Sequence, residues 1–351
     1  MPGIKSARPK PHRLAKSIIR LSARAIKGDR DVTCHNCRID AKRNGKRPDG
    51  LQRYRCPQCG KTYSDRTEFG VIGHKQIDDQ KALLALQLIV EGNSLRVAHR
   101  ITGLARNTIL RLVELAGERC EALLATKLRN VPVKDVQCDE IWTFVGKKRA
   151  HRRGNEENFA EIGDAWIFVG IERHTKLVLA FELGSRSVKS ATRFMRKIDV
   201  ATDPNQKFQL TTDGLNAYST AVGNVLGHQG ERVDYAQLIK IYALDVPEDV
   251  RRYSPPRLAE AIPTPVYGVP DEAKICTSHV ERQNLTMRMC MRRLTRLTNG
   301  FSKKWSNLRA ALALHFAWYN FCRKHMSLKG ATPAMAAGLA DRAWRIDELL
   351  G

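Results

Sequence analysis

The spacing of apolar residues over 76–118 has the period of amphipathic helices. Apolar positions recur there every three or four residues, and Gly92 interrupts the first series. Ser94 is a suitable cap for a second helix that ends near Ile101, and a third series covers 108–116. The pattern therefore predicts three short helices in this part of the chain.

The turn TGLARNT joins the last two of these helices. Two short helices with a glycine-containing turn between them resemble a helix-turn-helix, and such a unit would direct Arg106, Asn107 and Arg111 to a DNA groove. A three-helix packing unit without a DNA contact would produce the same pattern. We interpret residues 76–128 as a helix-turn-helix DNA-binding domain, with the packing unit as the alternative.

The next part of the chain alternates between strands and helices. Apolar runs at 136–145, 165–172 and 176–183 predict three successive strands. Helix, strand, helix and strand follow over 188–242. Three strands followed by this alternation is the order of a ribonuclease H-like fold, in which helices cover a mixed sheet. Residues 131–300 are therefore expected to form an α/β catalytic core of this type.

Two stretches depart from this alternation. Residues 245–272 are rich in proline and are expected to be an irregular insertion in the core. A long helix is expected from about Ser278 to Leu297. Residues 301–351, which contain the apolar run Ala310 to Phe321, are expected to form a C-terminal helical extension.

The N-terminal part carries a cysteine pattern. Four of the nine cysteines form the pairs CHNC and CPQC, which are separated by 18 residues. In a zinc ribbon each such pair supplies two thiolates to one ion, and the two pairs complete a tetrahedron. Residues 32–70 are therefore expected to form a zinc ribbon with one structural Zn²⁺, preceded by a basic arm over 1–31. The expected ligands are Cys34, Cys37, Cys56 and Cys59. The whole chain is thus expected to be a multidomain α+β protein.

The net charge of the chain indicates a polyanionic partner. Sixty Lys and Arg residues against 36 Asp and Glu residues give a net charge of +24. Residues 1–75 hold 19 basic and 6 acidic side chains, and the block from Arg282 to Lys329 holds 11 basic side chains and no acid. A basic surface attracts polyanions through phosphate contacts and counterion release. One such block alone is equally well explained by a solvated face, but two blocks indicate nucleic acid.

Neither a membrane span nor a secretion signal is indicated. The longest apolar run has about a dozen residues and contains His315, so it is too short to span a bilayer. Lys16, Arg20 and Arg24 interrupt any N-terminal apolar stretch that could act as a secretion signal. The sequence therefore predicts a cytoplasmic protein without a membrane partner.

Carboxylates occur where a two-metal centre for phosphoryl transfer needs them. Such a centre requires acidic side chains that converge from different elements, and hard oxygen ligands suit Mg²⁺ or Mn²⁺. Asp139 interrupts an apolar strand, where a carboxylate is costly unless it is paired or binds a metal. An acid that faces water at a sheet edge would also fit. Neighbouring strand residues point to opposite faces, so only one of Asp139 and Glu140 is expected to face the site.

Asp213 and Glu281 are the other two candidates. Asp213 ends a strand, at the end where α/β folds place ligand sites, but Asp-Gly is also a common turn pair. Glu281 is followed by 11 basic residues before the next acid. On the expected helix, Arg288 and Arg292 share the face of Glu281, which suits a metal ligand beside DNA. An acid that only stabilises the helix N-terminus is the alternative.

Several segments resemble one family of transposases. DEIWTFVGKK, TTDG, SHVERQNLTMR and RLTRLTNGFSKK are similar to motifs in the transposases of insertion sequence one, a bacterial DDE family. The resemblance extends over roughly Cys34 to His325 and includes the zinc ribbon and the helix-turn-helix segment. It implies that Asp139, Asp213 and Glu281 form the catalytic triad and hold two Mg²⁺ or Mn²⁺ ions.

The implied function is DNA transposition. The N-terminal segments would bind the terminal inverted repeats of the transposon. The core would hydrolyse a phosphodiester at each end and join the 3′-hydroxyls to target DNA by transesterification. The resemblance also implies a homodimer or larger homo-oligomer in the bacterial cytoplasm, at the nucleoid. Further DNA contacts are expected from Arg282, Arg288, Arg292, Arg293, Lys303 and Lys304.

Two other functions remain open at this point. A DNA-binding regulator, or a domesticated transposase that has lost cleavage, would need only the zinc ribbon and the helix-turn-helix. A serine or tyrosine recombinase would need a covalent nucleophile. Tyr218 and Tyr319 are candidates, although neither lies in a pattern that would activate it.

Overall fold

The computed structural model describes residues 34, 37, 39–46, 48, 52–64, 77–153, 162–227, 231–243, 258–296 and 298–350. The expected basic arm lies outside these residues. The chain divides into two compact units, Met1–Phe69 and Gly70–Gly351.

The first unit contains a small antiparallel sheet. Its strands β1 (Lys42–Lys46), β2 (Gln52–Arg55) and β3 (Thr62–Ser64) lie in the order β1-β2-β3. Among its described residues, only Cys34, Tyr54 and Cys56 are buried. The described part of the first unit therefore has little apolar core. Two of its three buried side chains, Cys34 and Cys56, belong to the expected metal ligands.

The second unit begins with the three helices that the apolar spacing predicted. They are α2 (Asp79–Val90), α3 (Leu95–Thr102) and α4 (Arg106–Lys127). Ser94 caps α3 as expected, because its hydroxyl accepts a hydrogen bond from the Val97 N–H at 3.2 Å. Gly103 ends α3 with a φ of 72°, which glycine adopts without strain. α4 extends beyond the expected third helix because its buried face continues to Leu124.

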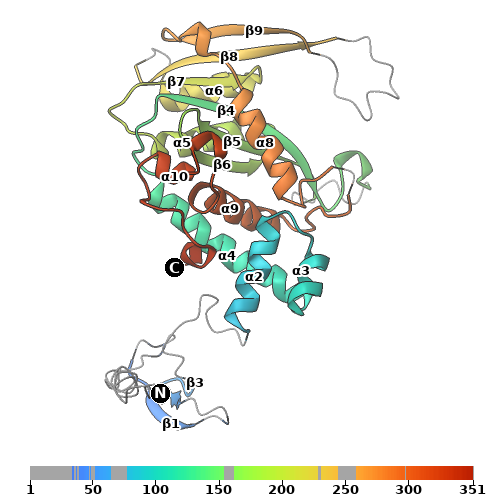
Figure 1. Ribbon diagram of the computed structural model, residues 1–351, viewed down its shortest axis with the longest axis vertical. Coiled ribbons are helices and arrows are strands. Elements are labelled where there is room, and N and C mark those ends of the chain that lie inside the picture. The colour runs from blue at the N-terminus through green and yellow to red at the C-terminus, as the bar shows by residue number, and fades with distance from the viewer. Residues whose placement is uncertain are drawn as a thin grey trace, which may run out of the picture. The chain divides into compact units, whose positions relative to one another are not determined.

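A six-stranded mixed sheet forms the centre of the second unit (Figure 1). Its order is β6-β5-β4-β7-β8-β9. β4 pairs antiparallel with β5 and β5 with β6, whereas β7 and β8 run parallel to β4 and β9 is antiparallel to β8. The strands are β4 (Asp135–Val145), β5 (Gly163–Glu172), β6 (Val178–Gly184), β7 (Phe208–Asp213), β8 (Val233–Tyr242) and β9 (Leu258–Tyr267).

Helices cover both faces of this sheet. α5 (Val188–Ala201) and α6 (Asn216–Leu226) lie on one face, where Phe168 of β5 packs 5.8 Å from the rings of both Phe194 and Tyr218. α8 (Ser278–Cys290) lies on the other face, and the Gln137 side chain of β4 accepts a hydrogen bond from the α8 backbone at His279. Figure 1 shows α8 crossing in front of the strands, with α5 and α6 behind them.

The C-terminal segment is part of this core. α9 (Trp305–Phe321) is almost entirely buried and packs between α4 and the sheet. A Cβ on Gly117 of α4 would lie 2.3–2.6 Å from the Ala310 backbone, so only glycine allows the two helices to approach this closely. The short helix α10 (Pro333–Ala336) and 3-10 turns at 149–151, 272–274, 326–328 and 346–350 complete the described elements.

Two expectations about secondary structure are wrong. The stretch 245–272 is not irregular throughout, because β9 forms in it and pairs with β8. The prediction was wrong because it took proline as a sign of irregular structure. Pro263 and Pro265 lie in β9, and a strand at a sheet edge tolerates residues without an N–H. The helix expected to continue to Leu297 ends at Cys290. Met291 and Leu294 are still buried, so the apolar period continues through a turn that is not helical.

No helix in the described part of the chain is both long enough and apolar enough to cross a lipid bilayer.

Candidate functional site

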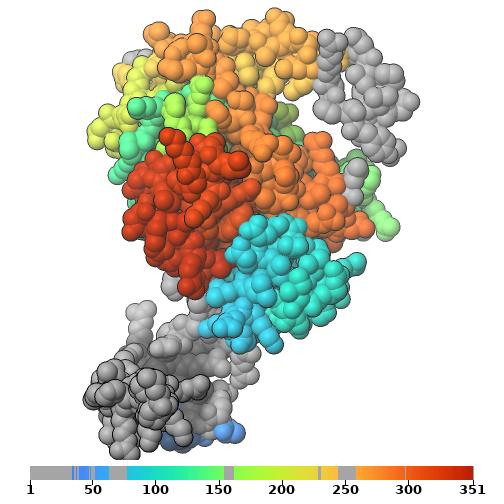
Figure 2. Space-filling model, in the orientation of Figure 1, coloured from blue at the N-terminus to red at the C-terminus, as the bar shows by residue number. Residues whose placement is uncertain are grey.

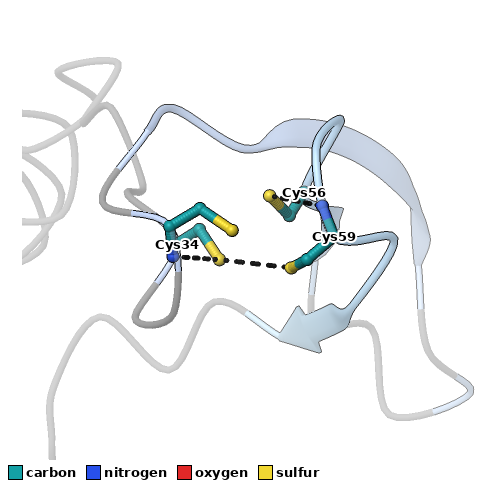
Figure 3. A group of neighbouring side chains, drawn as sticks. Cys34, Cys56 and Cys59 are labelled. Atoms are coloured by element: carbon teal, nitrogen blue, oxygen red, sulfur yellow. Dashed lines mark hydrogen bonds between the residues drawn. The ribbon is translucent and has the colours of Figure 1, made fainter.

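The four expected zinc ligands form one cluster. Their sulfur atoms all lie within 4.8 Å of one another, and the Cys34 and Cys59 sulfurs are 3.7 Å apart (Figure 3). A tetrahedral zinc ion with sulfur ligands at 2.3 Å requires sulfur separations of about 3.8 Å. The cluster therefore fits a single metal ion of this kind.

The turn after Cys56 favours the thiolate form of that cysteine, whereas burial raises the pKa of the Cys37 thiol to about 12. In each CxxC pair the second backbone N–H donates to the first sulfur, from Cys37 to Cys34 at 3.4 Å and from Cys59 to Cys56 at 3.5 Å. The hydrogen bond from the Cys59 N–H lowers the pKa of the Cys56 thiol, against the effect of burial. Gly60 closes the second turn with a φ of 69°. Thiolate is the form that binds metal.

A second cluster lies in the middle of the six-stranded sheet. The pairing of β4 with β7 ends at Cys138 and Thr212, so the next residues, Asp139 and Asp213, lie side by side. Carboxylate oxygens of Asp139, Asp213 and Glu140 all lie within 4.8 Å of one another. This is a hard-oxygen donor set of the type that binds Mg²⁺ or Mn²⁺.

Glu140 belongs to this cluster, against the expectation that only one of the two neighbouring acids faces it. Asp139 points to the α8 face, where its Oδ2 accepts a hydrogen bond from Asn284 at 2.9 Å. Glu140 points to the opposite face. β7 ends at Asp213 while β4 continues to Val145, so Asp213 stands beside an edge of β4 that has no strand partner in the described residues. Side chains from both faces of β4 can therefore reach it.

Glu140 is held by an arginine. Its Oε1 accepts a hydrogen bond from Arg186 at 2.7 Å, and its side chain is only 1% exposed. Its Oε2 is buried and has no hydrogen-bond partner in the described part of the chain. Arg186 lies between β6 and α5, stacks on Trp166 at 4.8 Å and is 3.9 Å from Asp213. A buried carboxylate oxygen without a partner is costly, so a cation beside it would stabilise the site.

Burial and mutual repulsion disfavour the ionised forms of these acids. Burial, followed by the charge of Asp213, raises the pKa of Asp139 to about 6. The same two causes raise the pKa of Glu140 to about 7. Burial also raises the pKa of Asp213. Three acids with raised pKa values in one place are typical of a site that is completed by a bound cation.

Glu281 lies next to this cluster but is not part of it. It sits in the first turn of α8, its side chain is 46% exposed, and its Oε1 accepts hydrogen bonds from Thr277 at 2.6 Å and from Lys240 of β8. Its charge still contributes to the raised pKa of Asp139. His279, two residues earlier, contacts Lys176 instead, at 3.1 Å.

Sequence reasoning missed three members of this environment. Lys240 had a signal, because it is a charged residue between the apolar residues Ile239 and Ile241 of β8. Glu140 was visible but was excluded by strand alternation. Arg186 had no signal, since its role follows only from the distance between the β6–α5 turn and β4.

The expected DNA-contacting residues lie in two places. Arg282 is exposed on α8, and Arg288 is partly buried, with its guanidinium 3.4 Å from the Leu294 carbonyl. The other seven line one cavity that is formed by α3, α4 and the segment 291–307. They are Arg106, Asn107, Arg111, Arg292, Arg293, Lys303 and Lys304.

The tyrosines considered as covalent nucleophiles are both buried. Tyr218 is 0% exposed and Tyr319 is 4% exposed, and burial raises the pKa of each hydroxyl. A nucleophile of this kind must reach DNA and ionise readily. Their positions therefore argue against a tyrosine recombinase that uses either residue.

Comparison with known proteins gives only weak similarity. No protein-family model matches the chain, and no curated protein sequence matches it. Among solved structures, the chain is similar to a piggyBac transposase synaptic complex with hairpin DNA. The identity is 8% and the TM-score 0.36, over 79% of this chain and 70% of that chain.

Two Mos1 structures are also similar. The Mos1 strand transfer complex has 15% identity and a TM-score of 0.19, over 43% of this chain and 56% of that chain. The Mos1 mariner paired end complex with Mn has 14% identity and a TM-score of 0.17, over 43% and 57%. The chain thus spans little more than half the length of the Mos1 chains. All of these TM-scores are below 0.5, so the similarities do not identify a function.

Proposed function

We propose that this protein is a DNA transposase of the DDE type, with a ribonuclease H-like core. The observation that carries the proposal is the convergence of Asp139, Glu140 and Asp213 where β7 ends beside β4, with Glu281 of α8 next to them. The strand order, with three antiparallel strands followed by two that run parallel to β4, supports a ribonuclease H-like sheet. The resemblance of the surrounding motifs to insertion sequence one transposases supports the same reading.

The carboxylates are assigned as ligands of two divalent ions, Mg²⁺ or Mn²⁺. Such ions, when bound, activate the attacking oxygen and neutralise charge on the leaving oxygen. Asp139 and Asp213 contribute from two adjacent strands, and the unpartnered Glu140 Oε2 suits the same role. Glu281 joins them when its carboxylate leaves Lys240. Asn284 and Arg186 orient Asp139 and Glu140 by hydrogen bonds.

The proposed reaction has two steps. Water attacks the phosphorus at a transposon end and breaks the bond to the 3′ oxygen, which leaves as a 3′-hydroxyl. That hydroxyl then attacks a phosphorus of target DNA and displaces a second 3′ oxygen. The protein contributes positioning and charge neutralisation. The cysteine cluster, as a zinc ribbon, and α2 to α4, as a helix-turn-helix, hold the terminal inverted repeats in a homodimer or larger assembly.

Strand cleavage on a duplex with the element's terminal repeat tests the proposal. Wild type is compared with Asp139→Asn, Asp213→Asn and Glu281→Gln, each with Mg²⁺, Mn²⁺ or chelator. The matched control is Asp341→Asn, an exposed acid outside the cluster. We expect metal-dependent nicking that the control retains and the three variants lose, with DNA binding unchanged.

The alternative is a DNA-binding regulator that does not cleave. Tight binding to the repeat without cleavage by wild type, in either metal, would establish it and would refute the transposase assignment. A covalent protein–DNA adduct would refute both.

A further inference from the structure

A cavity of about 720 Å³ lies in the second unit, away from the carboxylates. One wall is formed by α3 and the N-terminal end of α4, and the other by the segment that follows α8. In Figure 2 this segment, in orange, adjoins α2 and α3, in cyan. Glu281 and Met291 are ten residues apart, so α8 places the cavity about 15 Å along its axis from Glu281.

Both walls of the cavity are cationic. Arg96, Arg106 and Arg111 belong to the first wall, and Glu114 is the one acid among the lining residues. The second wall adds Arg292, Arg293, Lys303 and Lys304. The start of α4 has no side-chain cap, so its N–H groups add positive potential at the same place. Two basic segments that are almost 200 residues apart in the sequence therefore surround a single space.

Apolar side chains also line the cavity, together with one buried histidine. Val90, Leu110 and Leu314 contribute aliphatic surface, and His315 of α9 lies among the lining residues. His315 is 1% exposed, and neither of its ring nitrogens has a hydrogen-bond partner in the described residues. Burial lowers its pKa to about 3, so the imidazole is neutral. A neutral imidazole offers one donor and one acceptor.

Close backbone contacts hold the two walls together. A Cβ on Gly92, in the turn before α3, would lie 2.7 Å from the Met289 carbonyl at the end of α8. Gly117 allows α4 to lie equally close to Ala310 of α9. Within the second wall, Gly300 lets its loop approach the Arg292 carbonyl. The cavity is therefore fixed by packing and is not created by a ligand.

We propose that this cavity receives one unpaired nucleotide of a DNA strand, with the base among the apolar residues and His315, and the phosphate between the cations. The volume lies in the range of sites for single small ligands, whereas a duplex is too wide to enter. Apolar lining residues suit the faces of a base, and a cationic rim suits its phosphates. The proposal rests on the proposed function in requiring DNA as the partner.

Binding of the full-length chain to modified duplexes tests this inference, in chelator and at one fixed salt concentration. The probes are a fully paired duplex, the same duplex with one extrahelical 2-aminopurine, and the same duplex with an extrahelical abasic nucleotide. We expect the 2-aminopurine duplex to bind about tenfold more tightly than either of the others. Its fluorescence should change as the base leaves solvent.

Variants on both walls locate the site. Arg111→Gln and Lys304→Gln change exposed residues and should each reduce the tenfold preference to less than about threefold. His315→Leu should abolish the difference between base and abasic probes. The matched control is Lys127→Gln, at the opposite end of α4. If His315→Leu does not fold, the two wall variants decide the question.

Three results would overturn the inference. Equal affinity for the paired and extrahelical duplexes would show that the base does not enter the cavity. Equal affinity for the 2-aminopurine and abasic duplexes would show the same. Competition by free deoxyadenosine monophosphate as strong as by the extrahelical duplex would assign the cavity to a free nucleotide. In each case DNA is still bound and the proposed function stands. Failure to bind any DNA would instead refute the proposed function.

Discussion

The two candidate metal centres differ in how the chain builds them. Each half of the cysteine cluster comes from four consecutive residues and one tight turn. The carboxylate cluster and its neighbour Glu281 come from two strands and a helix, with 74 residues from position 139 to 213 and 68 from 213 to 281. The first centre is a local structure, whereas the second exists only when the sheet is assembled.

The two centres also differ in what stabilises them. Few side chains are buried among the described residues of the cysteine unit, so its order is expected to depend on a bound ion. The carboxylates lie in a sheet that is already held by an extensive apolar core. We therefore expect metal to stabilise the fold at the first centre, and the fold to position metal at the second.

Loss of the ion from the cysteine cluster should have the largest effect. Structural zinc contributes about 10–16 kcal/mol of apparent binding free energy in small zinc domains. Cys56→Ser should lose one zinc per chain and the hydrogen-exchange protection of β1 to β3, with β4 to β7 unchanged. The control variant Cys290→Ser, at a cysteine outside the cluster, should keep the zinc ion and the hydrogen-exchange protection of β1 to β3. If the amides of β1 to β3 stay protected without zinc, the first unit does not depend on its ion for order.

Glu140→Gln should weaken metal binding at the carboxylates without unfolding the sheet. Loss of a supporting ligand typically costs 10- to 100-fold in metal affinity, so we expect an effect of about that size on Mn²⁺ binding by calorimetry. The matched control is Glu182→Gln on β6, which also removes a buried carboxylate, one that is paired with Arg193 and Lys197. Equal Mn²⁺ affinity of wild type and Glu140→Gln would exclude Glu140 from the centre.

Gly117→Ala should lower the free energy of unfolding of the second unit and leave the first unit unchanged. The added methyl group would collide with the Ala310 backbone and push α4 from α9. Overpacking of this kind costs about 1–3 kcal/mol. Urea unfolding monitored by tryptophan fluorescence should show that loss, while zinc content stays the same. Glu118→Ala, at an exposed position of the same helix, should change stability by less than about 0.5 kcal/mol.

A last effect is expected on the pH dependence of the metal-free protein. The raised pKa values of Asp139 and Glu140, about 6 and about 7, mean that the folded state binds protons more tightly than the unfolded state. Stability should therefore rise as the pH falls from about 8 to about 5, by roughly 4 kcal/mol if the two acids titrate independently. The double variant Asp139→Asn, Glu140→Gln should flatten this dependence in thermal unfolding. An unchanged slope would mean that other groups cause it.

The sequence was informative where structure depends on local spacing. The cysteine pairs, the cap at Ser94 and the strands β4 to β8 follow from residues within a few positions of one another. Strand alternation holds at Asp139 and Glu140, but it does not exclude Glu140 from the site, because β4 continues beyond the end of β7 and both of its faces can reach Asp213. The proline rule failed at β9, since it holds for central strands and not for edges.

Other features could not be deduced from the sequence at all. The basic residues of α3 and α4 line one cavity with those of the segment 291–304, because α8 and the glycine contacts bring the two regions together. The pairing of Glu281 with Lys240 likewise depends on the distance between α8 and β8. Such relations depend on the packing of elements far apart in the chain, about which residue spacing says nothing.

The prolines of β9 also bear on how the protein behaves at high concentration. An exposed edge strand is a template on which a strand of another molecule can pair, and this is a common start of aggregation. Proline within a sheet is tolerated where its missing N–H would have faced solvent. Pro263 and Pro265 therefore leave gaps in the outer row of donors along β9. At high concentration, copies of this chain are therefore less prone to join edge to edge along β9.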